Sequence, residues 1–327
     1  MMHGGNVWQG NDPAYWLDFS ANLRPEGPPN WVKEAMFKAV EDARYYPPLV
    51  QKSVQEALSY YTCAKPTCIF PCSGGIQAID LICQMAPKRI VIQSPTFGEY
   101  KNRALANGKE CVYFGETAFQ ADDFVFICNP NNPTGHAYSR DEMMQIYAKV
   151  SQARATLVVD EAFIDFCVEN SVRSFAQEVD DIIVVGSLTK TLCVPGVRLG
   201  YIVAKEETIY NLQEKCAPWS LNCFANAIAK ELPQHIATIQ EDVKNNKIRR
   251  TKLRQALVEM GMEVYPSESN FLLVRSQQLV PFELLQQKGI LVRKCSSFGL
   301  DDFHMRVAVK TEEDNRRLLE ALREVLA

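Results

Sequence analysis

Long apolar runs, basic blocks and paired metal-ligand spacings are all absent from this 327-residue sequence. No stretch of about 18 uncharged apolar residues occurs, which excludes an ordinary membrane-spanning helix. The first residues lack the basic and then apolar order of a signal peptide, so we expect the chain to stay in the cytoplasm. The formal net charge is −4, with lysine and arginine spread along the chain. This distribution offers no electrostatic footprint for nucleic acid or an anionic membrane.

The cysteines are typical of a reducing compartment. There are eleven, and Cys83, Cys128 and Cys167 lie in apolar segments where cysteine is usually a small buried residue. We therefore expect no disulfides. The segment from Cys63 to Cys72 holds three cysteines without a CxxC pair or a nearby histidine, which is poor spacing for zinc, and we expect no metal site.

The first two thirds of the sequence alternate between short apolar runs rich in branched residues and helix-like segments. The runs cover residues 89–95, 123–130, 155–163 and 181–188, and the clearest helical segment covers 139–153. This rhythm predicts an α/β protein with a mainly parallel sheet flanked by helices. In such sheets ligands bind at the carboxyl ends of the strands, so we expect the functional site there.

The pattern changes from about residue 225. A long charged helical segment runs to residue 260, short strand-like segments follow, and a final helix is predicted over 311–327. We predict a large domain over residues 40–225. Residues 1–39 and 226–327 would then form a smaller α+β domain to which the N-terminal segment returns.

One segment concentrates phosphate-binding and nucleophilic side chains. In SLTKTLCVPGVRLGY, a predicted strand leads into Ser187, Thr189 and Lys190, and Arg198 follows eight residues after the lysine. A lysine amine can form a Schiff base with a carbonyl cofactor. Arginine presents a planar fork of donors that suits a phosphate, and the neighbouring hydroxyls can add to it. Taken singly, each residue could equally be an ordinary polar residue at a strand end.

Four other segments suit a flat, phosphorylated cofactor. The glycine pair in CSGGIQAID (72–80) opens a helix whose N–H groups can bind phosphate. Phe97 in SPTFGEY can stack on a flat ring. NPNNPTG (129–135) forms a turn with asparagines that can enter a cleft. DEAF (160–163) ends a buried strand in a carboxylate, which needs a cationic partner such as a protonated pyridine nitrogen.

The order and spacing of these five motifs resemble the aspartate aminotransferase superfamily of pyridoxal 5'-phosphate (PLP) enzymes, fold type I, over about residues 18–310. The resemblance implies that Lys190 forms the Schiff base, Asp160 pairs with the pyridine nitrogen, Asn132 bonds the ring hydroxyl and Phe97 stacks on the ring. The residues implied for the cofactor phosphate are Gly74, Gly75, Ile76, Ser187, Thr189 and Arg198, together with Tyr46 from the partner subunit of a homodimer. Arg306 would bind the substrate α-carboxylate.

Within the superfamily, several segments resemble the threonine-phosphate decarboxylase family of cobalamin biosynthesis more than the histidinol-phosphate aminotransferases. They are HGGN (3–6), DFSANLRPEG (18–27), DEAF, PWSLN (218–222) and VRKCSSFGL (292–300). The resemblance implies decarboxylation of L-threonine O-3-phosphate to (R)-1-aminopropan-2-yl phosphate. Arg293 and His3 would bind the substrate phosphate, while Ser20 and Asn22 would line the pocket. Phe163 stands where the aminotransferases have tyrosine, so one phenol near the ring is missing.

Three other functions are compatible with the same motifs. Arg24 stands where relatives have asparagine, and an extra cation near the pocket would favour phosphoserine, giving ethanolamine phosphate. An aminotransferase for histidinol phosphate or an aromatic amino acid would need 2-oxoglutarate, which a decarboxylase does not. A PLP-binding module without turnover is the third alternative, and it would have no need of all five of the following residues: Lys190, Asp160, Asn132, Arg198 and Arg306.

Overall fold

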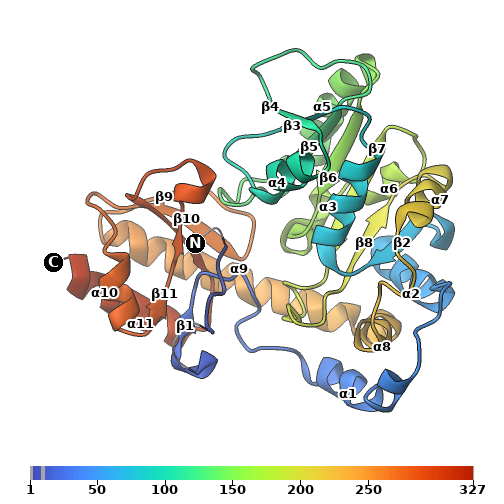
Figure 1. The fold of residues 1–327 in the computed structure, drawn as a ribbon. Coiled ribbons are helices and arrows are strands. Elements are labelled where there is room, and N and C mark those ends of the chain that lie inside the picture. The colour runs from blue at the N-terminus through green and yellow to red at the C-terminus, as the bar shows by residue number, and fades with distance from the viewer. Residues whose placement is uncertain (1–2, 9–11, 327) are drawn as a thin grey trace.

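The computed structural model describes residues 3–8 and 12–326, and Ala327 of the predicted last helix lies outside the described residues. Two sheets form the framework, and the larger one has seven strands (Figure 1). In spatial order these are β2 (Ile69–Cys72), β8 (Gly200–Val203), β7 (Ile182–Ser187), β6 (Thr156–Asp160), β5 (Phe124–Cys128), β3 (Arg89–Ile92) and β4 (Glu110–Tyr113). Only β8 runs against its neighbours in this sheet. The prediction of a mainly parallel sheet is therefore confirmed.

Apart from the edge strand β4, both faces of the large sheet are buried, which explains why its strands are continuous apolar runs. Along β6, for example, Leu157 and Val159 face one core while Val158 faces the other. The helices on one face are α3 (Gly74–Met85), α4 (Glu99–Ala106) and α7 (Glu206–Lys215). Those on the other are α1 (Asn30–Lys38), α2 (Lys52–Thr62), α5 (Arg140–Gln152), α6 (Arg173–Ala176) and α8 (Cys223–Glu231).

Local capping fixes the start of the helix predicted over 139–153. The Ser139 hydroxyl accepts a hydrogen bond from the Glu142 backbone N–H, and the Glu142 carboxylate accepts one from the Ser139 backbone N–H. Each side chain satisfies a donor that the first helical turn would otherwise leave unpaired. Short 3-10 helices occur at Pro13–Tyr15, Glu41–Arg44, Pro66–Cys68, Ile164–Asn170, Leu232–His235 and Ser296–Phe298.

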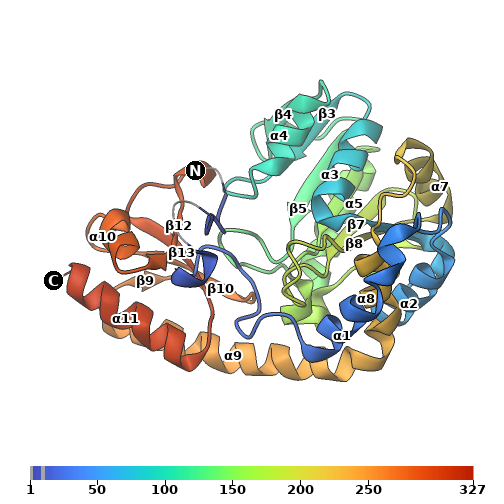
Figure 2. The same ribbon diagram turned by 60° about the horizontal axis from the view of Figure 1, so that its bottom comes forward.

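The smaller sheet is antiparallel and is built from the C-terminal part of the chain. Its order is β12 (Arg293–Lys294), β13 (His304–Ala308), β10 (Phe271–Arg275) and β9 (Glu263–Val264). Its helices are α9 (Ile236–Glu259), α10 (Phe282–Gln287) and α11 (Glu312–Leu326). In Figure 2, α9 runs below both sheets and joins them.

The N-terminal segment returns to the C-terminal part of the chain, where it forms a third sheet of two strands and contacts the smaller sheet. Strand β1 (Leu17–Asp18) pairs in parallel with β11 (Ile290–Leu291), and the Ala308 N–H donates to the Phe19 carbonyl. We propose domain boundaries near residues 39 and 225, as predicted from the sequence. No helix in the described part of the chain is both long and apolar enough to cross a membrane.

Candidate active site

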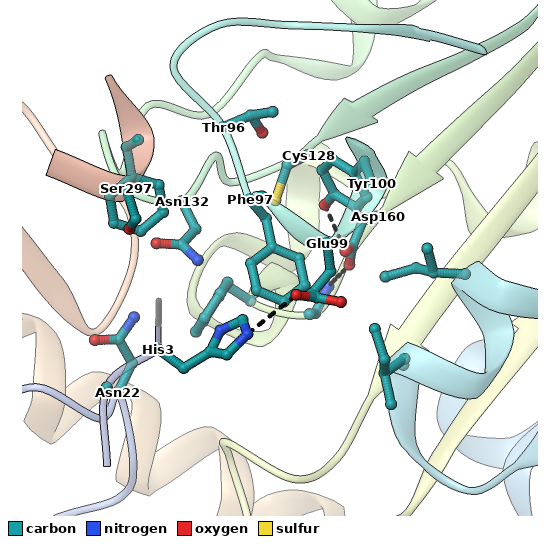
Figure 3. Close-up of a pocket in the computed structure, with 18 of the residues that line it drawn as sticks. His3, Asn22, Thr96, Phe97, Glu99, Tyr100, Cys128, Asn132, Asp160 and Ser297 are labelled. Atoms are coloured by element: carbon teal, nitrogen blue, oxygen red, sulfur yellow. Dashed lines mark hydrogen bonds and ion pairs between the residues drawn. The ribbon is translucent and has the colours of Figure 1, made fainter. Parts of the chain in front are cut away.

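A cavity of about 680 Å³ lies between the two sheets, at the carboxyl ends of β5, β6 and β7 (Figure 3). All of the residues predicted for the site line this cavity, except Gly74 and Tyr46. The lining residues that were predicted are His3, Ser20, Asn22, Gly75, Ile76, Phe97, Asn132, Asp160, Ser187, Thr189, Lys190, Arg198, Arg293 and Arg306. Residues from both ends of the chain therefore meet at one place, where the sheet rule predicts a ligand.

Lys190 follows the end of β7 and faces the cavity. Its carbonyl accepts a hydrogen bond from the Arg24 backbone N–H at 3.3 Å, which ties the lysine loop to the N-terminal segment. Burial, together with the nearby charges of Arg306 and Arg198, lowers the pKa of Lys190 to about 8. A substantial fraction of this amine is therefore neutral and nucleophilic near neutral pH.

Asp160 ends β6 as a buried carboxylate. One carboxylate oxygen accepts a 2.6 Å hydrogen bond from the Tyr100 hydroxyl, and the other accepts one of 2.9 Å from the Ala162 backbone N–H. Burial raises the pKa of Asp160, whereas these hydrogen bonds lower it. Among the described residues, the charge of Lys190 also lowers the pKa of Asp160 without forming an ion pair with it, so a cationic ligand group beside the carboxylate would be stabilised.

The start of α3 and Arg198 form an anion cradle. Gly74 has φ +74°, and a Cβ atom there would lie 2.8 Å from Nη2 of Arg198, so only glycine lets the guanidinium lie this close. Gly75 and the side chains of Ser187 and Thr189 line the adjoining cavity wall. Helix N–H groups, hydroxyls and a guanidinium in one corner have the chemistry that binds a phosphate.

Two arginines occupy the wall formed by the smaller sheet. Arg293 on β12 and Arg306 on β13 are direct cross-strand partners, and both are about 5% exposed. Arg306 donates to the Asn132 side-chain oxygen at 2.5 Å and to the Ser20 carbonyl at 2.6 Å, while its Nε has no partner among the described residues. Arg293 donates to the Ser297 hydroxyl at 2.6 Å.

The aromatic ring of Phe298 lies beside both of these guanidinium groups. The Arg293 guanidinium lies 5.1 Å from its centroid and that of Arg306 lies 6.0 Å away. Burial lowers the pKa of both arginines, but a guanidinium stays charged at neutral pH. Two buried like charges opposite each other repel, and an anion beside them would relieve that repulsion.

The N-terminal segment forms part of the cavity wall. His3 Nε2 lies 3.0 Å from a carboxylate oxygen of Glu99, at the start of α4 (Figure 3). The Ser20 hydroxyl donates to Asp18 at 2.6 Å and accepts from the Gly5 N–H at 2.8 Å. Ser20 thus lines the pocket as predicted, but its hydroxyl holds the N-terminal segment in place.

The two remaining predicted site residues lie outside the cavity wall for different reasons. Gly74 contributes backbone behind Arg198. Tyr46 is 80% exposed, and its ring lies 4.7 Å from that of Trp219 on the protein surface. Its predicted contact across a subunit interface stays a prediction.

The interpretation of Arg24 as an extra pocket cation is wrong. Its guanidinium forms a fork with the Asp242 carboxylate of α9 at 2.9 and 3.1 Å and donates to the Gly27 carbonyl at 2.9 Å. It does not line the cavity. The phosphoserine alternative loses the observation on which it depended, because this charge is neutralised against a helix instead of facing a ligand.

Several cavity residues were missed by the sequence analysis. Tyr100 and Glu99 belong to the same SPTFGEY segment as Phe97, and Phe298 belongs to the segment VRKCSSFGL. A signal for Tyr100 was available: it follows Phe97 by three residues, so a helix starting there places both rings on one side. No comparable pattern indicates that Glu99 would meet His3.

Comparison with known proteins gives consistent matches. Residues 15–322 match the family described as aminotransferase class I and II. The threonine-phosphate decarboxylase of Salmonella typhimurium (strain LT2) is 32% identical, and the match covers 99% of this chain and 96% of that protein.

Two solved structures have the same fold. The L-threonine-O-3-phosphate decarboxylase of Porphyromonas gingivalis has a TM-score of 0.86 at 25% identity, and the histidinol-phosphate aminotransferase of Clostridium acetobutylicum has a TM-score of 0.86 at 26% identity. In each case the match covers 94% of this chain and 98% of the other. Because the TM-scores are equal, the fold does not choose between the two reactions.

Proposed function

Since the chain belongs to the aminotransferase class I and II family of PLP-dependent, fold type I enzymes, we propose that it decarboxylates a small O-phosphorylated amino acid. The most suitable substrate is L-threonine O-3-phosphate, which gives (R)-1-aminopropan-2-yl phosphate for cobalamin assembly. The proteins similar to this chain include both decarboxylases and aminotransferases, so the choice of reaction and substrate is our proposal. The Salmonella relative, similar over nearly its whole length, supports it.

The observation that carries the proposal is the cross-strand pair Arg293 and Arg306. L-Threonine O-3-phosphate has a carboxylate and a phosphate separated by two carbon atoms, so one small molecule can neutralise both guanidinium groups. Histidinol phosphate itself carries a phosphate but no carboxylate, so this molecule would use only one of the two arginines. A guanidinium group binds a carboxylate or a phosphate through two parallel hydrogen bonds, so two arginines side by side on one wall of the cavity favour a substrate with two anionic groups.

The residues present fit PLP at the other wall of the cavity. The cradle formed by Gly74, Gly75 and Arg198 suits its phosphate, and the buried Asp160 carboxylate suits a protonated ring nitrogen. Phe97 and Asn132 would contact the ring face and the ring hydroxyl. When bound, PLP supplies an electron sink for the bond that breaks at the substrate Cα.

The chain's own residues then select which bond breaks. Arg306 would hold the carboxylate, and Arg293 with His3 would hold the phosphate, so binding energy from the phosphate fixes the orientation at Cα. Phe163, which is 5% exposed and packs against Phe271 at 5.1 Å, presents no hydroxyl in the cavity. Lys190, with its lowered pKa, is suited to return a proton to Cα after CO2 has left.

A direct assay tests the reaction. The PLP-loaded enzyme is incubated with phosphothreonine or, separately, with phosphoserine, in the absence of any oxo acid, and CO2 and the phosphorylated amine are measured. We expect CO2 release over many turnovers with phosphothreonine. Absence of CO2, together with conversion of the cofactor to its amine form by histidinol phosphate, would show that the enzyme is an aminotransferase. A strong preference for phosphoserine would correct the substrate.

Lys190 should give cofactor uptake a distinctive pH dependence. Only the neutral amine attacks a carbonyl, and burial lowers the pKa of Lys190 to about 8. The rate of PLP uptake by the cofactor-free protein should therefore rise about tenfold per pH unit below pH 8 and become constant above it. Stopped-flow absorbance between pH 6 and 10 measures this rate. Arg306→Gln should move the midpoint upward, because it removes a positive charge that lowers the pKa. A rate that keeps rising tenfold per pH unit up to pH 10 would contradict the prediction.

We propose that the enzyme is a homodimer that uses an exposed apolar surface near Tyr46. The large exposed side chains in this part of the chain are Phe37, Val40, Tyr45, Tyr46, Leu49 and Val50. So many exposed apolar side chains in one segment are typical of an interaction site. Val50→Asp should therefore give a monomer in sedimentation velocity that binds PLP more weakly, whereas Leu284→Asp, on the exposed surface of α10, should stay dimeric. A dimeric Val50→Asp protein would place the interface elsewhere.

The eleven cysteines are free thiols, which supports the cytoplasm as the compartment that we propose for the enzyme.

A further inference from the structure

Tyr100 lies behind the proposed cofactor ring site without belonging to the residues assigned to it. Tyr100 follows Phe97 by three residues and lies in the first turn of α4, and its side chain is fully buried. Figure 3 shows its hydroxyl directed at Asp160. The Tyr100 oxygen lies 2.6 Å from Oδ2 of Asp160. A carboxylate can only accept a hydrogen bond, so the phenol is the donor.

Tyr100 stays a donor throughout the neutral range. Burial raises its pKa well above the usual value, and the negative charge of Asp160 raises it further. The phenol therefore keeps its proton and can satisfy one oxygen of Asp160 permanently.

The hydrogen bonds to Asp160 leave room for one more donor. Oδ2 accepts from Tyr100 and Oδ1 accepts from the Ala162 N–H. Two carboxylate oxygens offer about four acceptor positions, so a ring N–H can join these two donors without displacing either. Three donors together would keep the carboxylate anionic at a site where burial favours its neutral form.

The same side chain also contacts the residue proposed to stack on the ring. The Phe97 and Tyr100 rings meet edge to face, with centroids 5.6 Å apart and an interplanar angle of 86°. Behind them, Tyr100 packs against Phe126 of β5 at 5.3 Å. Edge-to-face packing fixes ring orientation, so Tyr100 restrains Phe97 through its ring and Asp160 through its hydroxyl.

We propose that Tyr100 is a positioning residue that holds the Asp160 carboxylate opposite the pyridine nitrogen of PLP and holds Phe97 against the face of the same ring. This inference rests on the proposed function, because it takes the proposed roles of Asp160 and Phe97 as its premise. Tyr100 itself contacts neither the substrate nor the bond that breaks. It acts by keeping a proton on the ring nitrogen, where that proton strengthens the electron sink.

The test replaces only the hydroxyl. Tyr100→Phe keeps the ring that packs on Phe97 and Phe126, so the variant should fold. The matched control is Tyr147→Phe, which removes a similar 2.8 Å hydrogen bond, to Asp181. That pair lies at the opposite ends of the strands: Asp181 immediately precedes β7, whereas Asp160 ends β6. Both variants are loaded with PLP labelled with ¹⁵N in the pyridine ring.

The main measurement is the ¹⁵N chemical shift of the ring nitrogen between pH 6 and 9, which reports its protonation directly. In the unmodified enzyme and in Tyr147→Phe we expect the nitrogen to stay protonated. In Tyr100→Phe the protonated fraction should fall, and kcat for the decarboxylation should drop about tenfold or more, because a hydrogen bond to a charged group is lost. A role limited to folding would lower the Tm without changing the protonation of the nitrogen.

Asp160→Asn separates failure of this inference from failure of its premise. If Asp160→Asn loses the ring proton while Tyr100→Phe keeps it, with kcat within about twofold of the unmodified enzyme, the Tyr100 inference is wrong and the assignment of Asp160 stands. If Asp160→Asn also keeps the ring proton and full activity, the proposed role of Asp160 fails and the inference fails with it.

Discussion

Replacement of Lys190 by alanine is expected to abolish turnover of phosphothreonine and the visible absorbance that PLP acquires on binding to the lysine. The amine of Lys190 is the nucleophile proposed for the cofactor carbonyl, and its lowered pKa suits it to proton transfer at Cα. Loss of both roles should reduce kcat by roughly 10³-fold or more, since proton transfer alone contributes about 10²- to 10⁴-fold. Absorbance spectra and a CO2 assay on the same preparation measure the two effects together.

The control for this variant is Lys149→Ala. Lys149 is exposed on α5 and does not line the cavity, so spectrum and rate should stay unchanged. Exogenous methylamine should restore part of the rate in Lys190→Ala if the missing group is an amine. Full turnover by Lys190→Ala without added amine would refute the assignment of Lys190.

The larger part of the fold could be predicted from the sequence because its strands are buried on both faces. Runs such as DIIVVGSL, which became β7, have no polar face to confuse their assignment. The sequence also predicted that the motifs would meet in one cavity, because each follows a strand and parallel strands have their carboxyl ends at the same edge of the sheet. Asp160 and Lys190 lie 30 positions apart in the sequence, and both line the cavity at that edge.

The sequence does not predict which polar side chains contact one another across the cavity. Arg24 follows a pocket residue, Asn22, by two positions, yet its side chain turns to Asp242 on a helix more than 200 residues away in the sequence. The pairing of Arg293 with Arg306 depends on the register of β12 and β13, which short strands with an intervening loop do not specify. Contacts of this kind depend on tertiary geometry, and local patterns carry no information about them.

Because the register of β12 and β13 places Arg293 beside Arg306, the second large effect is expected for Arg293→Ala, on the binding of phosphothreonine. If Arg293 binds the substrate phosphate, this variant should weaken binding of phosphothreonine by about 10²-fold and leave the affinity for threonine nearly unchanged. The selectivity follows from position: Arg306 remains to bind the carboxylate that both ligands share. Spectral titration of the PLP-loaded protein with each ligand gives the two dissociation constants.

The matched control for Arg293→Ala is Arg275→Ala, in the same sheet. Arg275 lies 5.5 Å from the centroid of Phe303, much as Arg293 lies 5.1 Å from that of Phe298, but it does not line the cavity. Removing the Arg275 side chain should change neither dissociation constant. An effect of Arg293→Ala would then be due to a lost contact with the ligand and not to lost packing on an aromatic ring. Arg306→Ala should weaken the binding of both ligands, because both carry the carboxylate. If Arg293→Ala weakened threonine as much as phosphothreonine, Arg293 would not belong to the phosphate site, and the argument from two buried arginines to a substrate with two anionic groups would fail with it.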